Sequence, residues 1–309
     1  MNSLSLIGMS KNSGKTTVLN TLLSYYYSRG IPLGLTSIGR DGEDRDIVTD
    51  TGKPRIYVEE GTLFATTASL FRLCDVSKEL LQTTGINTPL GEVLIIRARS
   101  AGYVQLAGPS INAQLADIFG IMERYGAQTI LVDGAFARKT NASPAITGKT
   151  ILCTGASLDK NMHRVIEETR HVHDLLVSEK AAPELERIDK GFPLAIIKED
   201  GSSDGLEQAA LTDAAAEDLM RQGLRNAVII ADDASKFLLG PEIHSRLELR
   251  KIKLMVRRST RLLAVTINPV SARDWEFDAA EFKNALAALI KTPVINVMEE
   301  KEKLYDLLV

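Results

Sequence analysis

The segment LSLIGMSKNSGKTTVLN, residues 4–20, constrains the fold of this chain more than any other part of it. A short apolar run ends at Gly8, and apolar residues recur at helical spacing from residue 16 to residue 29, immediately after Gly14 and Lys15. A strand, a glycine-containing loop and a helix in this order are the setting of a phosphate-binding loop (P-loop), whose backbone N–H groups converge on an anion. The segment therefore predicts an α/β protein that binds a nucleotide.

The loop departs from the usual residue count. The standard pattern places four residues between its first glycine and the Gly-Lys pair, whereas five separate Gly8 from Gly14 here. We still expect Lys15 to reach the β- and γ-phosphates, Thr16 to bind the metal and Gly14 to allow close approach of the backbone. Lys11 would add a second cation near the transferred phosphate. The predicted nucleotide-binding residues are Lys11, Asn12, Ser13, Gly14, Lys15, Thr16 and Thr17.

A metal–triphosphate site also needs carboxylates at the ends of neighbouring strands. Asp133 follows the apolar run TILV and is the predicted strand-end acid, with catalytic and metal-binding roles; the alternative is an ordinary Asp-Gly turn. The turn SIGRDGEDRD contains four acids, of which Asp41 is our candidate catalytic residue and Glu43 our candidate metal ligand. A solvated run of charges is the alternative for this turn.

Apolar and helical segments alternate along the rest of the chain, which predicts βαβ units and a mainly parallel sheet flanked by helices. Two apolar runs within 92–108 suggest a β-hairpin insertion, and 180–192 is a candidate boundary. We expect a P-loop NTPase-like domain over 1–180 and a second α/β unit over 190–309, with one continuous domain as the alternative. Further strands are expected at 33–38, PRIYVEEG, TILCTG, PLAIIKED, NAVIIADD, RLLAVTINP and PVINVM, and helices near 62–74, 110–126, 158–178, 213–223 and 278–291.

Composition excludes several classes of protein. A formal charge of −3 gives no footprint for nucleic acid beyond a local patch such as Arg257-Arg258, and no window has the roughly 20 apolar residues that span a membrane. Cys74 and Cys153 each lie in an apolar run, which predicts reduced core thiols. No secretory signal is visible at the N-terminus, so a cytoplasmic location is expected.

Other polar residues have structural explanations that we prefer. The helix near 110 would be capped by Asn112 or Gln114, and strand-terminating Asn-Pro explains Asn268 better than a contact with a base edge. The spacing of the histidines on the helix over 158–178 matches no metal site, which favours surface or interface positions. These histidines are His163, His171 and His173.

Taken together, LSLIGMSKNSGKTTVLN, GLTSIGRDGE, ILVDGAFARKTNASP, CTGASL and TINP resemble the P-loop subunit of the reactivase of lysine 5,6-aminomutase, an adenosylcobalamin-dependent enzyme. The resemblance spans most of the chain and rests on the joint order of these motifs. It implies ATP- and Mg²⁺-dependent exchange of damaged cobalamin on the aminomutase, together with a MutS-like ATPase subunit. It leaves open a paralogue serving a related aminomutase, and whether this subunit itself hydrolyses ATP.

Three hypotheses follow from the sequence. The first is an ATPase (or GTPase) that drives a conformational change in a protein partner, and the chain could also form a homodimer. The second is an ATP-dependent small-molecule enzyme of the dethiobiotin-synthetase type, with substrate held by the hairpin and by Arg97 or Arg99. The third is a module that senses nucleotide without cleaving it.

Overall fold

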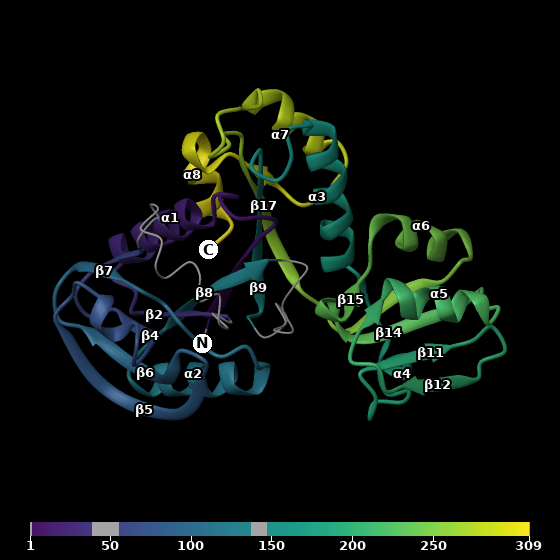
Figure 1. Ribbon diagram of the computed structural model, residues 1–309, viewed down its shortest axis with the longest axis horizontal. Coiled ribbons are helices and arrows are strands. Elements are labelled where there is room, and N and C mark those ends of the chain that lie inside the picture. Colours follow the sequence, from purple (N-terminus) through teal and green to yellow (C-terminus); the bar gives the residue numbers. More distant parts are fainter. Residues whose placement is uncertain (1, 39–55, 137–146, 309) are drawn as a thin grey trace.

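The computed structural model describes residues 2–38, 56–136 and 147–308, and its largest element is a nine-stranded sheet flanked by helices (Figure 1). Neighbouring strands run parallel from β18 to β4, while β6 and β5 add an antiparallel hairpin at one edge. The chain is therefore α/β with a mainly parallel sheet. In order across the sheet the strands are β18 (Val294–Ile295), β17 (Arg261–Asn268), β9 (Lys149–Gly155), β1 (Asn2–Gly8), β8 (Thr129–Phe136), β2 (Leu33–Ser37), β4 (Leu63–Thr67), β6 (Gly91–Ala98) and β5 (Lys78–Thr88).

A five-stranded sheet forms a second unit, drawn in green in Figure 1. Its strands β10, β16 and β14 are parallel, and β11 and β12 are antiparallel additions. Two short pairs, β13 with β15 and β3 with β7, complete the strands of the described residues. The bounds are β10 (Glu179–Lys180), β16 (Lys253–Arg258), β14 (Val228–Asp233), β11 (Leu194–Ile197), β12 (Ser203–Leu206), β13 (Leu211–Thr212), β15 (Phe237–Leu238), β3 (Ile56–Val58) and β7 (Gly102–Val104).

Helices cover both faces of the nine-stranded sheet because successive strand residues point to opposite faces. Side chains of α1 and α8 share one apolar core with β1, whereas α2 packs on the other face against β2 and β8. Further along that second face, α3 and α7 pack against β9 and β17. The helices are α1 (Lys15–Ser28), α2 (Asn112–Arg124), α3 (Met162–Leu176), α4 (Pro183–Glu186), α5 (Asp213–Arg221), α6 (Pro241–Leu249), α7 (Ala279–Ala287) and α8 (Val297–Asp306), with 3-10 turns η1 (Phe71–Leu73) and η3 (Ala234–Lys236).

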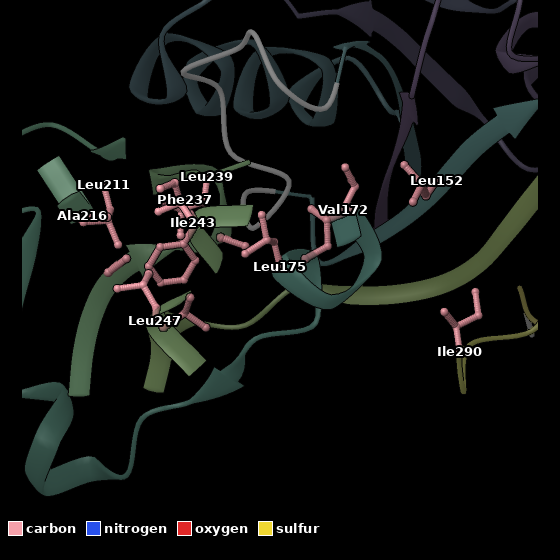
Figure 2. Packing of buried hydrophobic residues seen from close by; sticks show 14 of the residues in the cluster. Leu152, Val172, Leu175, Leu211, Ala216, Phe237, Leu239, Ile243, Leu247 and Ile290 are labelled. Atoms are coloured by element: carbon pink, nitrogen blue, oxygen red, sulfur yellow. The ribbon is translucent and has the colours of Figure 1, made fainter. Parts of the chain in front are cut away.

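One apolar core joins the two units through α3. Val172 and Leu175 of this helix belong to the same buried cluster as Leu152 of β9 and as Phe237 and Leu247 of the second unit (Figure 2). Because both sheets pack against the same helix, α3 is the structural element that holds the second unit against the first.

The division of the strands differs from the boundary expected between 180 and 190. Strands β17 and β18 come from the segment 190–309, yet they pair with β9 and complete the first sheet. The second sheet is therefore an insertion formed by 179–258, and only residues 259 and 260 separate its last strand, β16, from β17.

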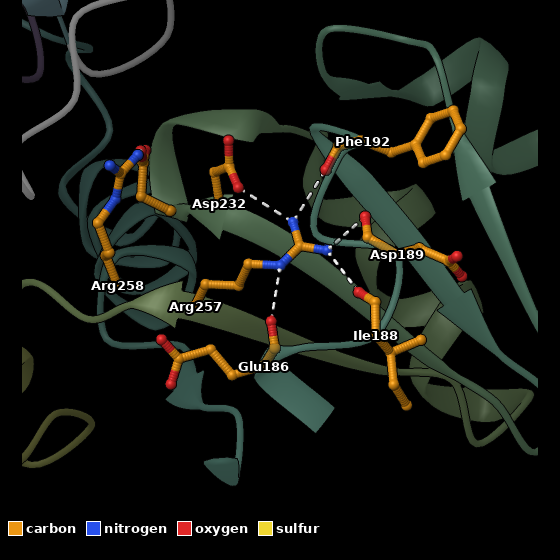
Figure 3. A network of polar contacts seen from close by, with 8 residues as sticks. Glu186, Ile188, Asp189, Phe192, Asp232, Arg257 and Arg258 are labelled. Atoms are coloured by element: carbon orange, nitrogen blue, oxygen red, sulfur yellow. Dashed lines mark hydrogen bonds and ion pairs between the residues drawn. The ribbon is translucent and has the colours of Figure 1, made fainter. Parts of the chain in front are cut away.

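The candidate boundary segment, 180–192, is held in place by Arg257 (Figure 3). Only 4% of this residue is exposed, and its guanidinium donates to four backbone carbonyls of 186–192 and to Asp232 Oδ1, at 3.0 to 3.3 Å. The neighbouring Arg258 forms an ion pair with Asp233 at 3.2 Å. The pair Arg257-Arg258 is thus no basic patch for nucleic acid, because Arg257 is buried and its guanidinium binds groups within the protein.

Three local expectations are wrong. Residues 62–74 form β4 and the turn η1 instead of a helix. The strands within 92–108 do not pair with each other, because β6 pairs with β4 and β5 while β7 pairs with β3; the hairpin is β5–β6. In PVINVM only Val294–Ile295 is a strand, since Asn296 accepts a hydrogen bond from the Met298 N–H and caps α8.

The other expected helices form within four residues of their predicted ends, as α1, α2, α3, α5 and α7. Along the described ranges, none of the helices is long and apolar enough to cross a bilayer.

Candidate functional site

The loop between β1 and α1 closes on its own beginning despite the additional residue. A Cβ placed on Gly8 would lie 2.7 Å from Ser13 Oγ and 2.9 Å from Lys15 Cδ, so only glycine fits there and the Lys15 side chain runs back over the end of β1. Asn12 and Gly14 adopt left-handed backbone angles, with φ of 61° and 89°. The left-handed conformations of these two residues accommodate the additional residue of the loop and place the N-terminus of α1 over the end of β1.

The N-terminus of α1 carries no side-chain cap from the described residues. Its N-cap is Gly14, no capping hydrogen bond from a described side chain is present, and its first turn contains no acid. The first N–H groups of a helix have no intrahelical partners and carry a partial positive charge. Lys15 is the first residue of the helix and adds a full positive charge at the same place.

Two loop hydroxyls lack hydrogen-bond partners among the described residues. They belong to Ser13, which is 2% exposed, and to Ser10, whose Oγ is likewise shielded from solvent. A buried polar atom without a partner costs about 1–3 kcal/mol, so such atoms in native proteins usually face a ligand or an ordered water. The interior of this loop therefore has unused hydrogen-bonding capacity where a phosphate would sit.

Asp133 lies in the carboxyl-terminal half of β8, the strand next to β1, and β8 continues beyond it to Phe136 instead of ending at this residue as expected. Its predicted catalytic and metal-binding roles stay predictions. In β8 Asp133 is in register with Leu6 of β1 and with Ser37, the last residue of β2. Ser37 is buried, and within the described ranges its hydroxyl has no hydrogen-bond partner. Ligands of parallel α/β sheets bind beyond the carboxyl ends of the strands, so Ser37 is a polar group of the site that pattern reasoning missed.

The charges of Lys15 and Asp133 both influence the pKa of Cys153. Burial raises the pKa of its thiol to about 11, the positive charge of Lys15 acts in the opposite direction, and the negative charge of Asp133 adds to the increase. Both charges are thus near the end of β9, where Cys153 is in register with Gly8. Cys74 and Cys153 are both buried free thiols, as expected, and Cys153 forms part of the floor of the site.

The predicted binding residues from Lys11 to Thr17 differ in exposure, and Ser13 among them is buried. Lys11, Asn12 and Thr17 are exposed, while Thr16 is half-buried at the start of α1. Asp41 and Glu43 lie outside the described residues, so their predicted catalytic and metal-binding roles stay predictions. Over the ranges that are described, His, Cys, Asp and Glu form no group of three that could hold a metal ion.

The arginines of the small-molecule hypothesis lie away from the loop. Arg97 is in register with Leu63, the first residue of β4, at the amino edge of the parallel strands. It donates to the Tyr125 carbonyl at 3.2 Å, and Arg99 forms an ion pair with Glu79 at 2.8 Å. The loop lies at the carboxyl ends of the parallel strands, whereas these arginines lie towards the amino ends. They therefore cannot hold a substrate beside Lys15.

Of the three histidines expected at surface or interface positions, two lie buried inside the protein. His171 and His173 are buried, and their ring nitrogens lie 2.8 Å from Leu239 O and 3.0 Å from Thr292 Oγ1. His163 is exposed. The buried pair therefore connects α3 to its neighbours on both sides.

Two further residues differ from their sequence interpretation. Asn112 is the first residue of α2, whose N-cap is Ile111, so the expected cap is absent there. Asn268 ends β17 as expected, but its amide nitrogen donates to the Asn12 carbonyl at 3.1 Å. The carboxyl end of β17 thus contacts the loop directly.

Compared with known protein families, with curated proteins and with solved structures, the chain gives no match.

Proposed function

We propose that this chain binds ATP or GTP together with Mg²⁺ at the loop Gly8–Thr17, and hydrolyses it to drive a conformational change in a protein partner. The observation that carries the proposal is the closed loop. The Lys15 side chain runs over Gly8, and the buried Ser13 hydroxyl has no hydrogen-bond partner among the described residues. Asp133, in the carboxyl-terminal half of the adjacent strand β8, would supply the carboxylate that such a site needs.

Each residue has a distinct task in this proposal. Lys15 and the first N–H groups of α1 bind the β- and γ-phosphates and stabilise the charge that develops as water displaces the γ-phosphoryl group, leaving a nucleoside diphosphate and phosphate. Thr16 and Asp133 offer the oxygen ligands that Mg²⁺ prefers, with water completing the shell. The ion, when bound, neutralises phosphate charge. Asp41 would orient the attacking water, and Glu43 would add a metal ligand.

The partner follows from the resemblance alone: an adenosylcobalamin-dependent aminomutase, acted on together with a MutS-like ATPase subunit. The second unit, 179–258, is large enough for a role beyond nucleotide binding. It is also connected directly, by α3 and β17, to the strands beside the loop. The cytoplasmic location and the homodimer stay predictions of the sequence.

Mg²⁺-dependent turnover of ATP and GTP by the full chain tests the proposal, with and without the aminomutase and its ATPase partner. Lys15→Ala should reduce turnover at least about 100-fold while the circular dichroism spectrum stays unchanged, because this lysine contacts ligand rather than core. Lys291→Ala, at an exposed position between α7 and β18, is the matched control and should turn over normally.

The outcomes separate the hypotheses. Wild-type turnover by Lys15→Ala would refute the site, and absence of any nucleotide binding would refute the function. Tight binding with no turnover, unaffected by Asp133→Asn, would support the sensing module instead. Release of ADP that depends on a small substrate, without a protein partner, would support the small-molecule enzyme.

A further inference from the structure

Asn268 contacts the phosphate loop at the place where the loop backbone is most constrained. Its Nδ2 donates to the Asn12 carbonyl at 3.1 Å, and its Oδ1 accepts from the Val270 N–H at 3.3 Å. Both ends of the amide are therefore engaged within the protein. A Cβ placed on Gly14 would lie 3.2 Å from the Cβ of Asn268, so this side chain lies directly against the loop.

The backbone that Asn268 supports is unfavourable by itself. Asn12 has a φ of 61°, in the left-handed region that costs most residues with a side chain about 1–2 kcal/mol and that asparagine tolerates better than most. Such conformations persist only where their surroundings hold them. The hydrogen bond to the Asn12 carbonyl is a long-range contact of this kind, joining positions 256 residues apart.

Asn268 is in turn fixed by the next strand. Its carbonyl accepts from the Ala156 N–H at 2.9 Å, and a Cβ on Gly155 would lie 2.3 Å from that carbonyl oxygen. Glycine at 155 thus lets β9 and β17 approach closely at their carboxyl ends. The result is a clamp in which β9 holds Asn268 and Asn268 holds the loop.

We infer that Asn268 is a positioning residue for the phosphate loop and does not read the base of the nucleotide. This inference rests on the proposed function, because it assumes that the loop binds phosphate. A residue that reads a base edge turns its amide towards the base, whereas the bonds to Asn12 and Val270 fix the orientation of the Asn268 amide towards the loop and its own turn. Asn268 should therefore affect the affinity for the phosphates of a ligand and not the affinity for its base.

The test compares a ligand that has no base with ligands that differ only in the base. Binding of inorganic tripolyphosphate, ATP and GTP with Mg²⁺ is measured by calorimetry for the wild type, Asn268→Ala and Asn268→Asp. The second variant keeps the shape and the acceptor for Val270 but replaces the donor to Asn12 with a carboxylate oxygen. Val270→Ala, at an exposed neighbouring residue, is the matched control.

Both Asn268 variants should weaken tripolyphosphate and ATP by the same factor, about 10-fold or more, and leave the ATP-to-GTP affinity ratio unchanged, with Val270→Ala like the wild type. Loss of ATP binding with tripolyphosphate binding intact, or a changed ATP-to-GTP ratio, would overturn the inference in favour of base reading. Unchanged binding of all three ligands would overturn it as well. A wild-type chain that binds none of them would instead refute the proposed function.

Discussion

Gly14 and Gly30 flank α1 and provide a matched pair of alanine substitutions. Both have positive φ, 89° and 62°, so alanine at either position should lower the free energy of unfolding by about 1–2 kcal/mol. They differ in their surroundings, because a Cβ on Gly30 would meet nothing within 4 Å, whereas one on Gly14 would press against Asn268 at 3.2 Å. Only Gly14→Ala should therefore displace the loop from Asn268.

The expected signature is equal destabilisation with unequal binding. Urea unfolding followed by circular dichroism should give similar midpoints for the two variants, both below the wild type. Nucleotide affinity should fall about 10-fold or more for Gly14→Ala, equivalent to about 1.4 kcal/mol, and stay unchanged for Gly30→Ala. Equal loss of affinity in both variants would mean that helix stability, and not contact with the loop, governs the site, and the reasoning would fail.

Two further predictions concern stability. Arg257→Met should lower the free energy of unfolding by about 3–5 kcal/mol, because it removes five hydrogen bonds of a buried guanidinium, whereas Arg221→Met, in an exposed ion pair with Asp218, should cost at most about 1 kcal/mol; equal urea midpoints would contradict this. Hydrogen bonds from Lys283 and Lys303 lower the pKa of Glu300 from 4.5 to about 2. Since the folded-state pKa is lowered, this contribution is complete above pH 4.5 and is lost as the pH falls towards 2. Acid titration of Glu300→Gln should therefore show a shallower loss of stability in that window, and a slope equal to that of the wild type would refute the assignment.

Strong local patterns in the sequence predict the elements that carry the loop. In α1 the buried residues follow helical spacing after a glycine, and in β8 an apolar run leads to Asp133, so both were predictable. The segment 63–67 was not, because all five residues of β4 are buried and show no alternation. A strand that is buried on both faces lacks the alternation that distinguishes a strand from a helix.

The part of the candidate site that comes from one short stretch of the sequence was predictable. Lys15 and Thr16 follow from a motif within a few residues, while the additional residue of the loop is accommodated by the backbone angles of Asn12 and Gly14, which no pattern specifies. The role of Asn268 depends on strand β17 returning beside β9 after the insertion of a whole sheet. Sequence reasoning could place Asn268 at a strand end but could not tell which loop it would meet.

The 256-residue separation of Asn12 and Asn268 has a consequence for biosynthesis. Chains emerge from the ribosome N-terminus first, at about 5–20 residues per second, so the loop and α1 are exposed many seconds before β17 can reach them. A nascent or prematurely terminated chain carries the lysine and the helix N-terminus but not the clamp that holds them in shape. Full affinity for phosphate would then be acquired last, and nucleotide binding would distinguish finished molecules from fragments.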